Sequence, residues 1–160
     1  MSQNKTAIKI GDRELSNTEI AKLAVAVATE KKAVRPVIMD LANLGAFTEL
    51  FTIVSAANPR QVYAIADSIK QFFKHNLSLS PLSVDGLESS TWVLIDYGFL
   101  FIHIFQEPTR ELYQLEQLWS KAHLINVVEE DIQNLFHEVL KISEEIKTAS
   151  ESEQHSNSLM

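Results

Sequence analysis

Residues 91–119 read TWVLIDYGFLFIHIFQEPTRELYQLEQLW: two apolar runs, a short turn and an amphipathic segment follow one another directly. Residues 92–96 and 99–105 are rich in β-branched and aromatic side chains, and Gly98 between them suits a turn position with a positive φ angle. This pattern predicts an antiparallel hairpin. Residues 100–105 carry apolar side chains at both alternating positions, which is typical of a central strand covered on both faces.

Capping signals mark where the helices begin. Residues 16–19, Ser-Asn-Thr-Glu, form a capping box that predicts a helix over about 17–31. Residues 58–61, Asn-Pro-Arg-Gln, combine an N-cap with a proline at the first helical position, and Pro108 opens a third helix. Strands are expected near the apolar runs at residues 37–40, 50–55 and 82–84. The order α-β-β-α-β-β-β-α predicts an α/β fold, a mixed sheet of about five strands with helices packed on it.

The last part of the chain predicts an appendage to a single domain. Apolar residues recur at helical spacing between 128 and 146, which predicts an amphipathic helix over about 129–147. Residues 151–160 are polar and serine-rich, so they are expected to be disordered. The predicted organisation is an N-terminal segment 1–15, a domain 16–127, a helical extension 128–150 and a tail 151–160. The helix either packs on the domain or contacts a second copy or another partner.

Composition narrows the function classes. At 160 residues and 46% apolar content the chain can bury one core, and the absence of cysteine excludes disulfides, thiolate zinc sites and a cysteine nucleophile. No signal peptide or membrane span is recognisable, so a cytoplasmic location is expected. Residues 128–160 hold eight acidic and two basic side chains, a net of −6, and the remaining 13 acidic and 12 basic leave −1. Such a chain lacks the basic footprint of a protein that binds nucleic acid through phosphates.

Candidate catalytic or metal-binding side chains are scattered rather than grouped. They are His75, His103, Asp40, Glu49, Asp67, Asp85 and Asp96. None forms a metal or nucleotide motif, and four glycines are too few for extensive phosphate cradling. No catalytic residue, cofactor or metal is therefore expected. His103 lies in an apolar strand, where a hydrogen-bonded structural histidine is the more frequent role.

The segment that begins at Trp92 resembles the ribosomal silencing factor family, also called the Iojap family. The matching positions are Trp92, Val93, Leu94, Asp96, Tyr97, Gly98, His103, Phe105, Gln106, Glu107, Arg110, Tyr113, Leu115, Glu116, Leu118 and Trp119. The resemblance extends upstream through residues 37–40, 47–61 and 81–86, and covers roughly 20–122. The chain departs from the family pattern at Phe99, where many members have Asp, and at Glu49 and Ala56. Phe99 removes a charge beside the expected binding surface, so the contact there should be more apolar.

The resemblance implies a nucleotidyltransferase-like topology and a function in translation. It implies that the sheet surface docks on the large-subunit ribosomal protein numbered fourteen and sterically blocks association with the small subunit, so that translation is repressed. Trp92, Leu94 and Tyr97 would be apolar anchors, and Asp96 would meet a basic group on the partner. Phe99 would lie beside these anchors, and Glu107, Arg110 and Glu116 rank lower, since an ion pair of Arg110 with a neighbouring carboxylate is equally well explained as helix support.

Three alternatives stay open at this stage. One is a factor for late assembly of the large subunit. Another is a nucleotidyltransferase-like enzyme, although the paired Asp-x-Asp carboxylates of such enzymes do not occur in this sequence. The third is a self-associating protein, such as a homodimer held by the C-terminal helix. Little direct contact with nucleic acid and none with membranes are expected.

Overall fold

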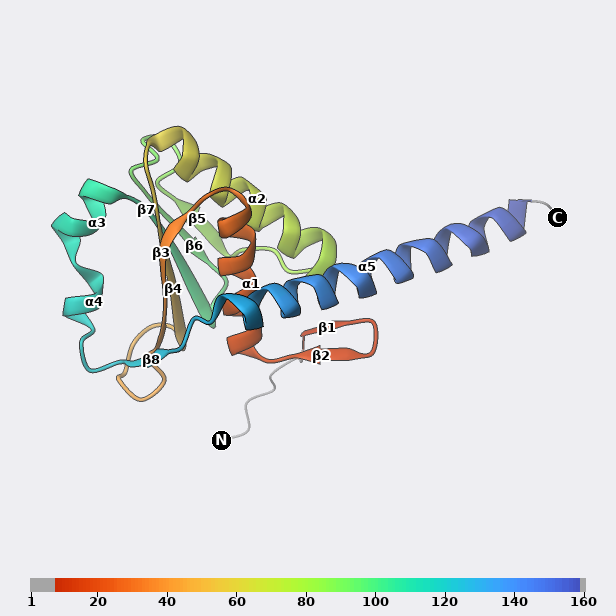
Figure 1. Cartoon of the computed structure of the whole chain (residues 1–160), viewed down its shortest axis with the longest axis horizontal. Coiled ribbons are helices and arrows are strands. Elements are labelled where there is room, and N and C mark those ends of the chain that lie inside the picture. Colours follow the sequence, from red (N-terminus) through yellow and green to blue (C-terminus); the bar gives the residue numbers. More distant parts are fainter. Residues whose placement is uncertain (1–7, 159–160) are drawn as a thin grey trace.

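Six strands form one mixed sheet in the computed structural model, which describes residues 8–158 (Figure 1). The spatial order is β5-β6-β7-β4-β3-β8, and β4 and β7 are the parallel pair while all other neighbours are antiparallel. The strands are β3 (Val34–Asp40), β4 (Leu50–Ala56), β5 (Ser83–Asp85), β6 (Trp92–Asp96), β7 (Leu100–Gln106) and β8 (His123–Ile125). The α/β class and the predicted hairpin are confirmed. Strand β7 is central, whereas β8 was not predicted because it is short and mostly exposed.

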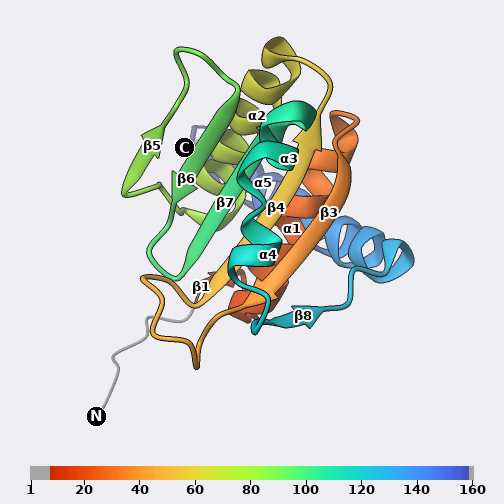
Figure 2. The same ribbon diagram turned by 90° about the vertical axis from the view of Figure 1, so that its left-hand side faces the viewer.

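Helices cover the two faces of the sheet unequally. The first face carries α1 (Asn17–Glu30), α2 (Pro59–Leu77) and the start of α5 (Glu129–Ser158). Within residues 8–158, the other face carries α3 (Glu107–Tyr113) and α4 (Leu115–Leu118) alone, which lie in front of the β3–β4 side and leave β5 and β6 open (Figure 2). Among residues 8–158, none of the helices combines the length and the apolar character needed to span a bilayer.

The predicted caps are present in the structure. Ser16 Oγ accepts from the Glu19 N–H at 3.1 Å, and a Glu19 carboxylate oxygen accepts from the Ser16 N–H at 3.0 Å, which completes the capping box of α1. Asn58 caps α2 by accepting from the Gln61 N–H at 2.9 Å. The Gln61 side chain bonds to the Ala57 N–H, one residue before the cap.

A small hairpin that was not predicted precedes α1. Strands β1 (Ile8–Ile10) and β2 (Arg13–Leu15) pair around Gly11, whose φ of 58° suits glycine. Arg13 of this hairpin forms ion pairs of 2.7 Å with Glu19 and with Glu138 of α5. The hairpin, α1 and α5 are therefore joined at one guanidinium.

The extension packs on the domain in its first half and then projects from it. Ile132, Phe136 and Val139 are buried against the helical layer, which answers the question that the sequence left open. Further along, α5 leaves the body as a single arm (Figure 1). Helix α5 continues to Ser158, and residues 159–160 lie outside the described residues, so the disordered tail expected over 151–160 stays a prediction. Residues 151–156 of α5 are exposed, so their own burial does not stabilise this part of the helix. The helix instead propagates from its packed first half.

The third predicted helix is broken in two. Gln114 adopts a left-handed conformation with φ of 47°, which ends α3 and changes the direction of the chain before α4. Leu115 is buried, whereas Leu112 is 76% exposed. The kink turns Leu112 away from the face that Leu115 and Trp119 share.

Replacing Gly86 tests the loop that leads from β5 into β6. Gly86 has φ of 93°, and an added Cβ would lie 2.1 Å from the carbonyl oxygen of Trp92. We expect Gly86→Ala to lower the free energy of unfolding by roughly 3 kcal/mol or more, since backbone strain and a backbone clash combine. Gly45→Ala is the matched control, because Gly45 has φ of 68° with open space around it and should lose only about 1 kcal/mol. If urea denaturation showed that Gly86→Ala and Gly45→Ala lose the same free energy of unfolding, the backbone clash at Gly86 would be contradicted.

Candidate functional site

The uncovered part of the sheet presents a contiguous row of side chains, which we call the open face: Ser83, Asp85, Leu94, Asp96 and Phe101. Because side chains alternate along a strand, every second residue of β6 and β7 points to this side. Leu94 is paired with Asp85 on β5 and with His103 on β7, and Asp96 is paired with Ser83 and Phe101. Leu94, Asp96 and Phe101 are half-buried, and Ser83 and Asp85 are exposed. The result is an apolar centre with acidic residues beside it.

Asp96 has a structural role as well as a position on the open face. One of its carboxylate oxygens accepts from the Gly98 N–H at 2.7 Å, within the turn between β6 and β7. The Tyr97 N–H donates to the Leu100 carbonyl at 2.9 Å and closes that turn. The turn thus fixes the direction of the carboxylate on the open face.

Beside Leu94, on the neighbouring strand β7, lies the histidine that the sequence singled out. His103 is 4% exposed, and its Nδ1 accepts from the Trp92 indole N–H at 3.1 Å. Burial lowers the pKa of His103 to about 3, so the ring is neutral near pH 7. Its Nε2 has no hydrogen-bond partner within residues 8–158, and its ring lies edge-to-face with Phe51 at 4.5 Å. The hydrogen-bonded structural role predicted for His103 is confirmed.

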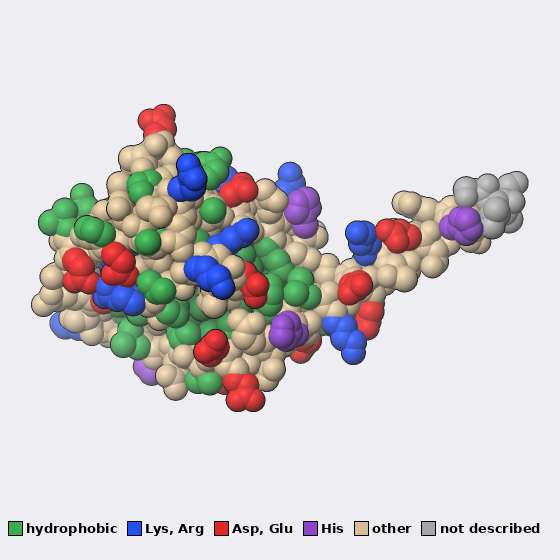
Figure 3. All heavy atoms as spheres, turned by 45° about the horizontal axis from the view of Figure 1, so that its top comes forward, with side chains coloured by type: hydrophobic (Ala, Val, Ile, Leu, Met, Phe, Trp, Pro, Cys, Tyr) green, Lys and Arg blue, Asp and Glu red, His purple; other side chains and the backbone are tan. Residues whose placement is uncertain are grey.

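Trp92 joins the open face to α3. Its ring stacks on Phe105 at 4.8 Å and lies 4.8 Å from the ring of Tyr113. Beyond it, α3 and α4 carry the exposed apolar side chains Leu112, Tyr113 and Leu118. Figure 3 shows hydrophobic side chains at the end of the molecule where these two helices lie. The apolar surface therefore continues from the sheet onto α3 and α4.

A buried arginine holds α3 in place. Arg110 is 2% exposed and donates to the Arg35 carbonyl and to Ser55 Oγ, both at 2.7 Å. Arg35 lies at an irregularity of β3, with φ of 54°, and its guanidinium contacts Glu107 and Glu111 at 2.7 Å each. Partial burial acts to raise the pKa of Glu107, but hydrogen bonds from Arg35 and Ser55 outweigh it and hold the pKa below its usual value. Glu107 and Arg110 thus belong to the network that supports α3.

The structure separates the residues that the resemblance grouped together. Leu94 and Asp96 lie on the open face, and Trp92 lies on the same side of the sheet, between that face and α3. Tyr97 and Phe99 do not lie there: Tyr97 is 6% exposed and packs against the Phe73 ring at 5.1 Å, on the helical side. Tyr97 and Arg110 are buried in the free chain, and their role as direct contacts stays a prediction.

Sequence reasoning missed several side chains at this surface. Phe101 lies on the open face, and its alternation with the covered residue Ile102 was a usable signal. The exposure of Leu112 and Tyr113 follows from the break at Gln114, for which the sequence gives no comparable signal.

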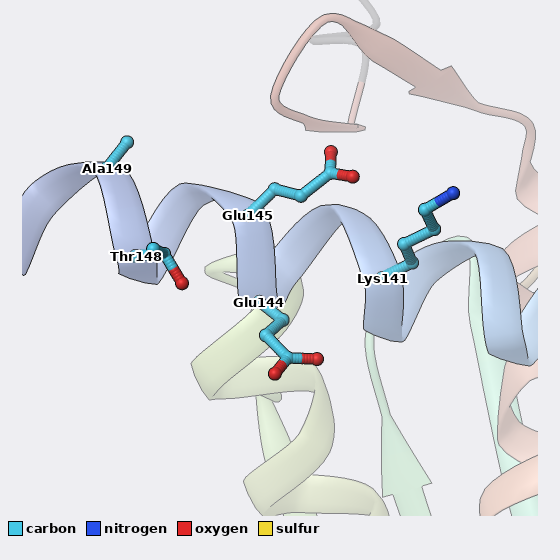
Figure 4. A pocket seen from close by; sticks show the side chains of 5 residues that line it. All are labelled: Lys141, Glu144, Glu145, Thr148 and Ala149. Carbon is cyan, nitrogen blue, oxygen red and sulfur yellow. The ribbon is translucent and has the colours of Figure 1, made fainter.

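Within residues 8–158, no three His, Asp or Glu side chains lie close enough to hold a metal ion together. A recess along α5 is lined by Lys141, Glu144, Glu145, Thr148 and Ala149. Glu144 points away from Lys141 and Glu145 (Figure 4). These side chains come from one helix and do not converge on a reacting centre.

Comparison with known proteins points to one family. The family described as "Ribosomal silencing factor during starvation" matches residues 14–158. "Ribosomal silencing factor RsfS" of Halalkalibacterium halodurans is 31% identical over 113 residues, which cover 71% of this chain and 96% of that protein. The mouse "Mitochondrial assembly of ribosomal large subunit protein 1" is 30% identical over 76 residues, 46% of this chain and 33% of that protein. A crystal structure of a Chromobacterium violaceum protein superposes with a TM-score of 0.63 at 27% identity, covering 66% of this chain and 88% of that one.

The buried imidazole predicts a defined pH dependence of stability. The folded pKa of His103, about 3, lies below the unfolded value of about 6.5, so between these pH values only the unfolded chain binds the proton. Stability should therefore fall as the pH drops from 6.5 towards 3, by up to about 1.4 kcal/mol per pH unit from this residue. His103→Gln keeps an acceptor for Trp92 and should flatten the dependence in urea denaturation series. His75→Gln alters an exposed histidine and serves as control; identical slopes for all three proteins would refute the assignment.

Proposed function

Because the chain belongs to the ribosomal silencing factor family, we propose that its ribosome-associated role is to bind the large subunit through the open face and keep the small subunit away. The proposed docking partner is the large-subunit ribosomal protein numbered fourteen. The observation that carries the proposal is a half-buried apolar centre on a sheet that is otherwise covered by helices. Leu94 and Phe101 form that centre. An apolar centre with a polar rim is the usual anatomy of a protein interface.

The charges of the open face favour a basic protein surface as the partner. Asp85 and Asp96 border the apolar centre, and the whole chain carries a net charge of −7. Such charges steer encounter with a basic surface and disfavour RNA phosphates. Trp92, Leu94 and Phe101 act as apolar anchors, and Asp96 orients the complex.

Silencing by this route needs no chemical step. A bound protein excludes the small subunit wherever the two would occupy the same space, so its effect depends on affinity and position alone. This agrees with a family that is not known as an enzyme family and is described by its effect on ribosomes.

A role in large-subunit assembly is the second candidate, and a specific observation favours it. The mouse relative is named for assembly of the mitochondrial large subunit. Both roles use the same docking surface, and they differ in the state of the subunit that is bound.

Self-association through α5 has less support. Ile132, Phe136 and Val139, the apolar face of α5, are buried against the same chain. A dimer formed through that face would first have to break these contacts.

Co-sedimentation with isolated ribosomal subunits tests the docking surface. We expect the intact protein to pellet with large subunits alone, and Leu94→Ala plus Phe101→Ala to weaken binding tenfold or more, as apolar anchors at an interface centre do. Tyr63→Ala plus Leu140→Ala is the matched control, since both residues are partly exposed on α2 and α5. Equal binding of the two double variants would reject the open face, and an intact protein that stays in the supernatant would reject ribosome docking.

Subunit profiles of cells that lack the protein separate the two roles. Silencing predicts mature subunits and more joined ribosomes in starved cells, since nothing then occupies the joining surface. Assembly predicts large subunits with immature RNA during growth. More joined ribosomes without immature large subunits would support silencing. Immature large subunits without more joined ribosomes would reject silencing in favour of assembly.

A further inference from the structure

The loop between β3 and β4, residues 41–49, carries the most exposed large apolar side chain in the part of the chain that the structure describes. Phe47 is 96% exposed, and the next in order, Leu82 and Leu112, are 76% exposed. Singly exposed apolar residues are common on protein surfaces, so exposure alone assigns no role to this ring. The support and the position of the loop do.

Backbone hydrogen bonds hold the loop closed. The Leu41 N–H donates to the Glu49 carbonyl at 2.8 Å, which joins the two ends of the loop. The Leu44 N–H donates to the Leu41 carbonyl at 3.0 Å and makes a turn in its first half. An Asp40 carboxylate oxygen accepts from the Ala42 N–H at 3.0 Å and fixes the start of that turn.

The residues on either side of Phe47 are held by the core. Ala46 packs against the buried cluster that contains Phe51 and Phe105. Thr48 is 6% exposed. Folding the ring of Phe47 back onto the protein would therefore require Ala46 or Thr48 to leave these positions. A side chain on a backbone that is already ordered loses less freedom on binding, which favours affinity.

The loop continues the open face. Leu50, the first residue after the loop, donates its N–H to the Phe99 carbonyl at 3.0 Å, in the turn between β6 and β7. Phe51 stacks on Phe101 of the open face, with ring centroids 6.1 Å apart. Ala46 and Phe101 also pack against the same buried cluster. Figure 1 shows the loop bulging towards the side of the sheet on which α3 and α4 lie, which is the side of the open face.

We propose that Phe47 is a further anchor of the docking surface and inserts into an apolar pocket of the same large-subunit protein that the open face binds. This contact depends on the proposed docking of the open face. Aromatic side chains are enriched in protein interfaces, where they fill such pockets. Two separated anchors also fix the rotation of the bound protein about the open face, and steric exclusion of the small subunit depends on that orientation.

The charges of the loop favour a protein over RNA as the partner of Phe47. An exposed aromatic ring can stack on an unpaired base, but such sites combine the ring with basic side chains that bind the phosphates. Residues 40–50 contain two carboxylates, those of Asp40 and Glu49, and no Lys or Arg. The loop therefore lacks the groups that would hold a nucleic-acid backbone beside the ring.

Binding titrations of the full chain with isolated large subunits measure the contribution of the ring. We expect Phe47→Ala to weaken binding tenfold or more, since an almost fully exposed ring gains nearly all of its apolar burial in the complex. Phe47→Leu keeps part of that apolar area and should lose less. Tyr63→Ala removes a 51% exposed ring on α2 and is the matched control, which should bind as the wild type does. Thermal unfolding of Phe47→Ala should equal that of the wild type.

Photocross-linking identifies what the ring contacts. With p-benzoylphenylalanine in place of Phe47, or in place of Leu94 on the open face, we expect cross-links to one and the same large-subunit protein. The same group in place of Tyr63 should give no cross-link to the subunit. Cross-links from the site of Phe47 to ribosomal RNA, or to a second copy of this chain, would overturn the proposed partner.

The titrations separate failure of the loop from failure of the open face. Phe47→Ala that binds as tightly as the wild type would reject the loop, while a loss in Leu94→Ala plus Phe101→Ala would still support the open face. A loss in Phe47→Ala alone would reject the open face, and with it the shared contact. An intact protein that does not bind large subunits would reject both.

Discussion

Strand β7 is hydrogen-bonded to a neighbour on each side, and this pairing determines what every other element can reach. Its residues pair in parallel with β4 from Leu50 to Ala56 and antiparallel with β6 from Trp92 to Asp96. Because side chains alternate, Leu100, Ile102 and Ile104 must enter the helical layer. Phe101, His103 and Phe105 must then face the other side, which α3 and α4 cover in part. The open face therefore arises because β7 carries apolar side chains on both faces of the sheet, whereas the helices cover one face fully and the other in part.

The extent of the open face depends on how firmly α3 is held at one side of it. Arg110 reaches from α3 under the helix to Ser55 and to the carbonyl of Arg35. Arg35 can offer that carbonyl because β3 is irregular there, and its own side chain returns to Glu107 and Glu111. Arg110 is buried and forms an ion pair with Glu116, and removing a partner from a buried charge is strongly destabilising, so these contacts hold α3 in place. The part of the sheet that α3 covers therefore ends at Trp92, whose ring contacts Phe105 of the sheet and Tyr113 of α3.

Local signals in the sequence were sufficient for most elements and for half of the site. Capping residues and strand alternation predicted α1, α2 and the β6–β7 hairpin, since those signals act between near neighbours. The hairpin at Ile8–Leu15 was missed although Gly11-Asp12 between alternating apolar residues is a turn signal. Tyr97 was grouped with Trp92 and Leu94, but it is out of phase with them along the strand and so lies on the other face. The burial of Arg110 was not predictable, because it depends on a bulge in a distant strand.

An uncovered apolar sheet face also invites contact with copies of the same chain, and the distribution of charge limits this. The outer strand β5 is three residues long and places Asp85 beside Leu94. Asp96 lies on β6, two residues after Leu94 and on the same face. Short edge strands and charged side chains are common protections against edge-to-edge pairing. Two copies meeting through this face would bring these carboxylates together under a net charge of −7 on each chain. A basic partner would instead neutralise them, so the features that discourage self-association also select the kind of surface that the open face can bind.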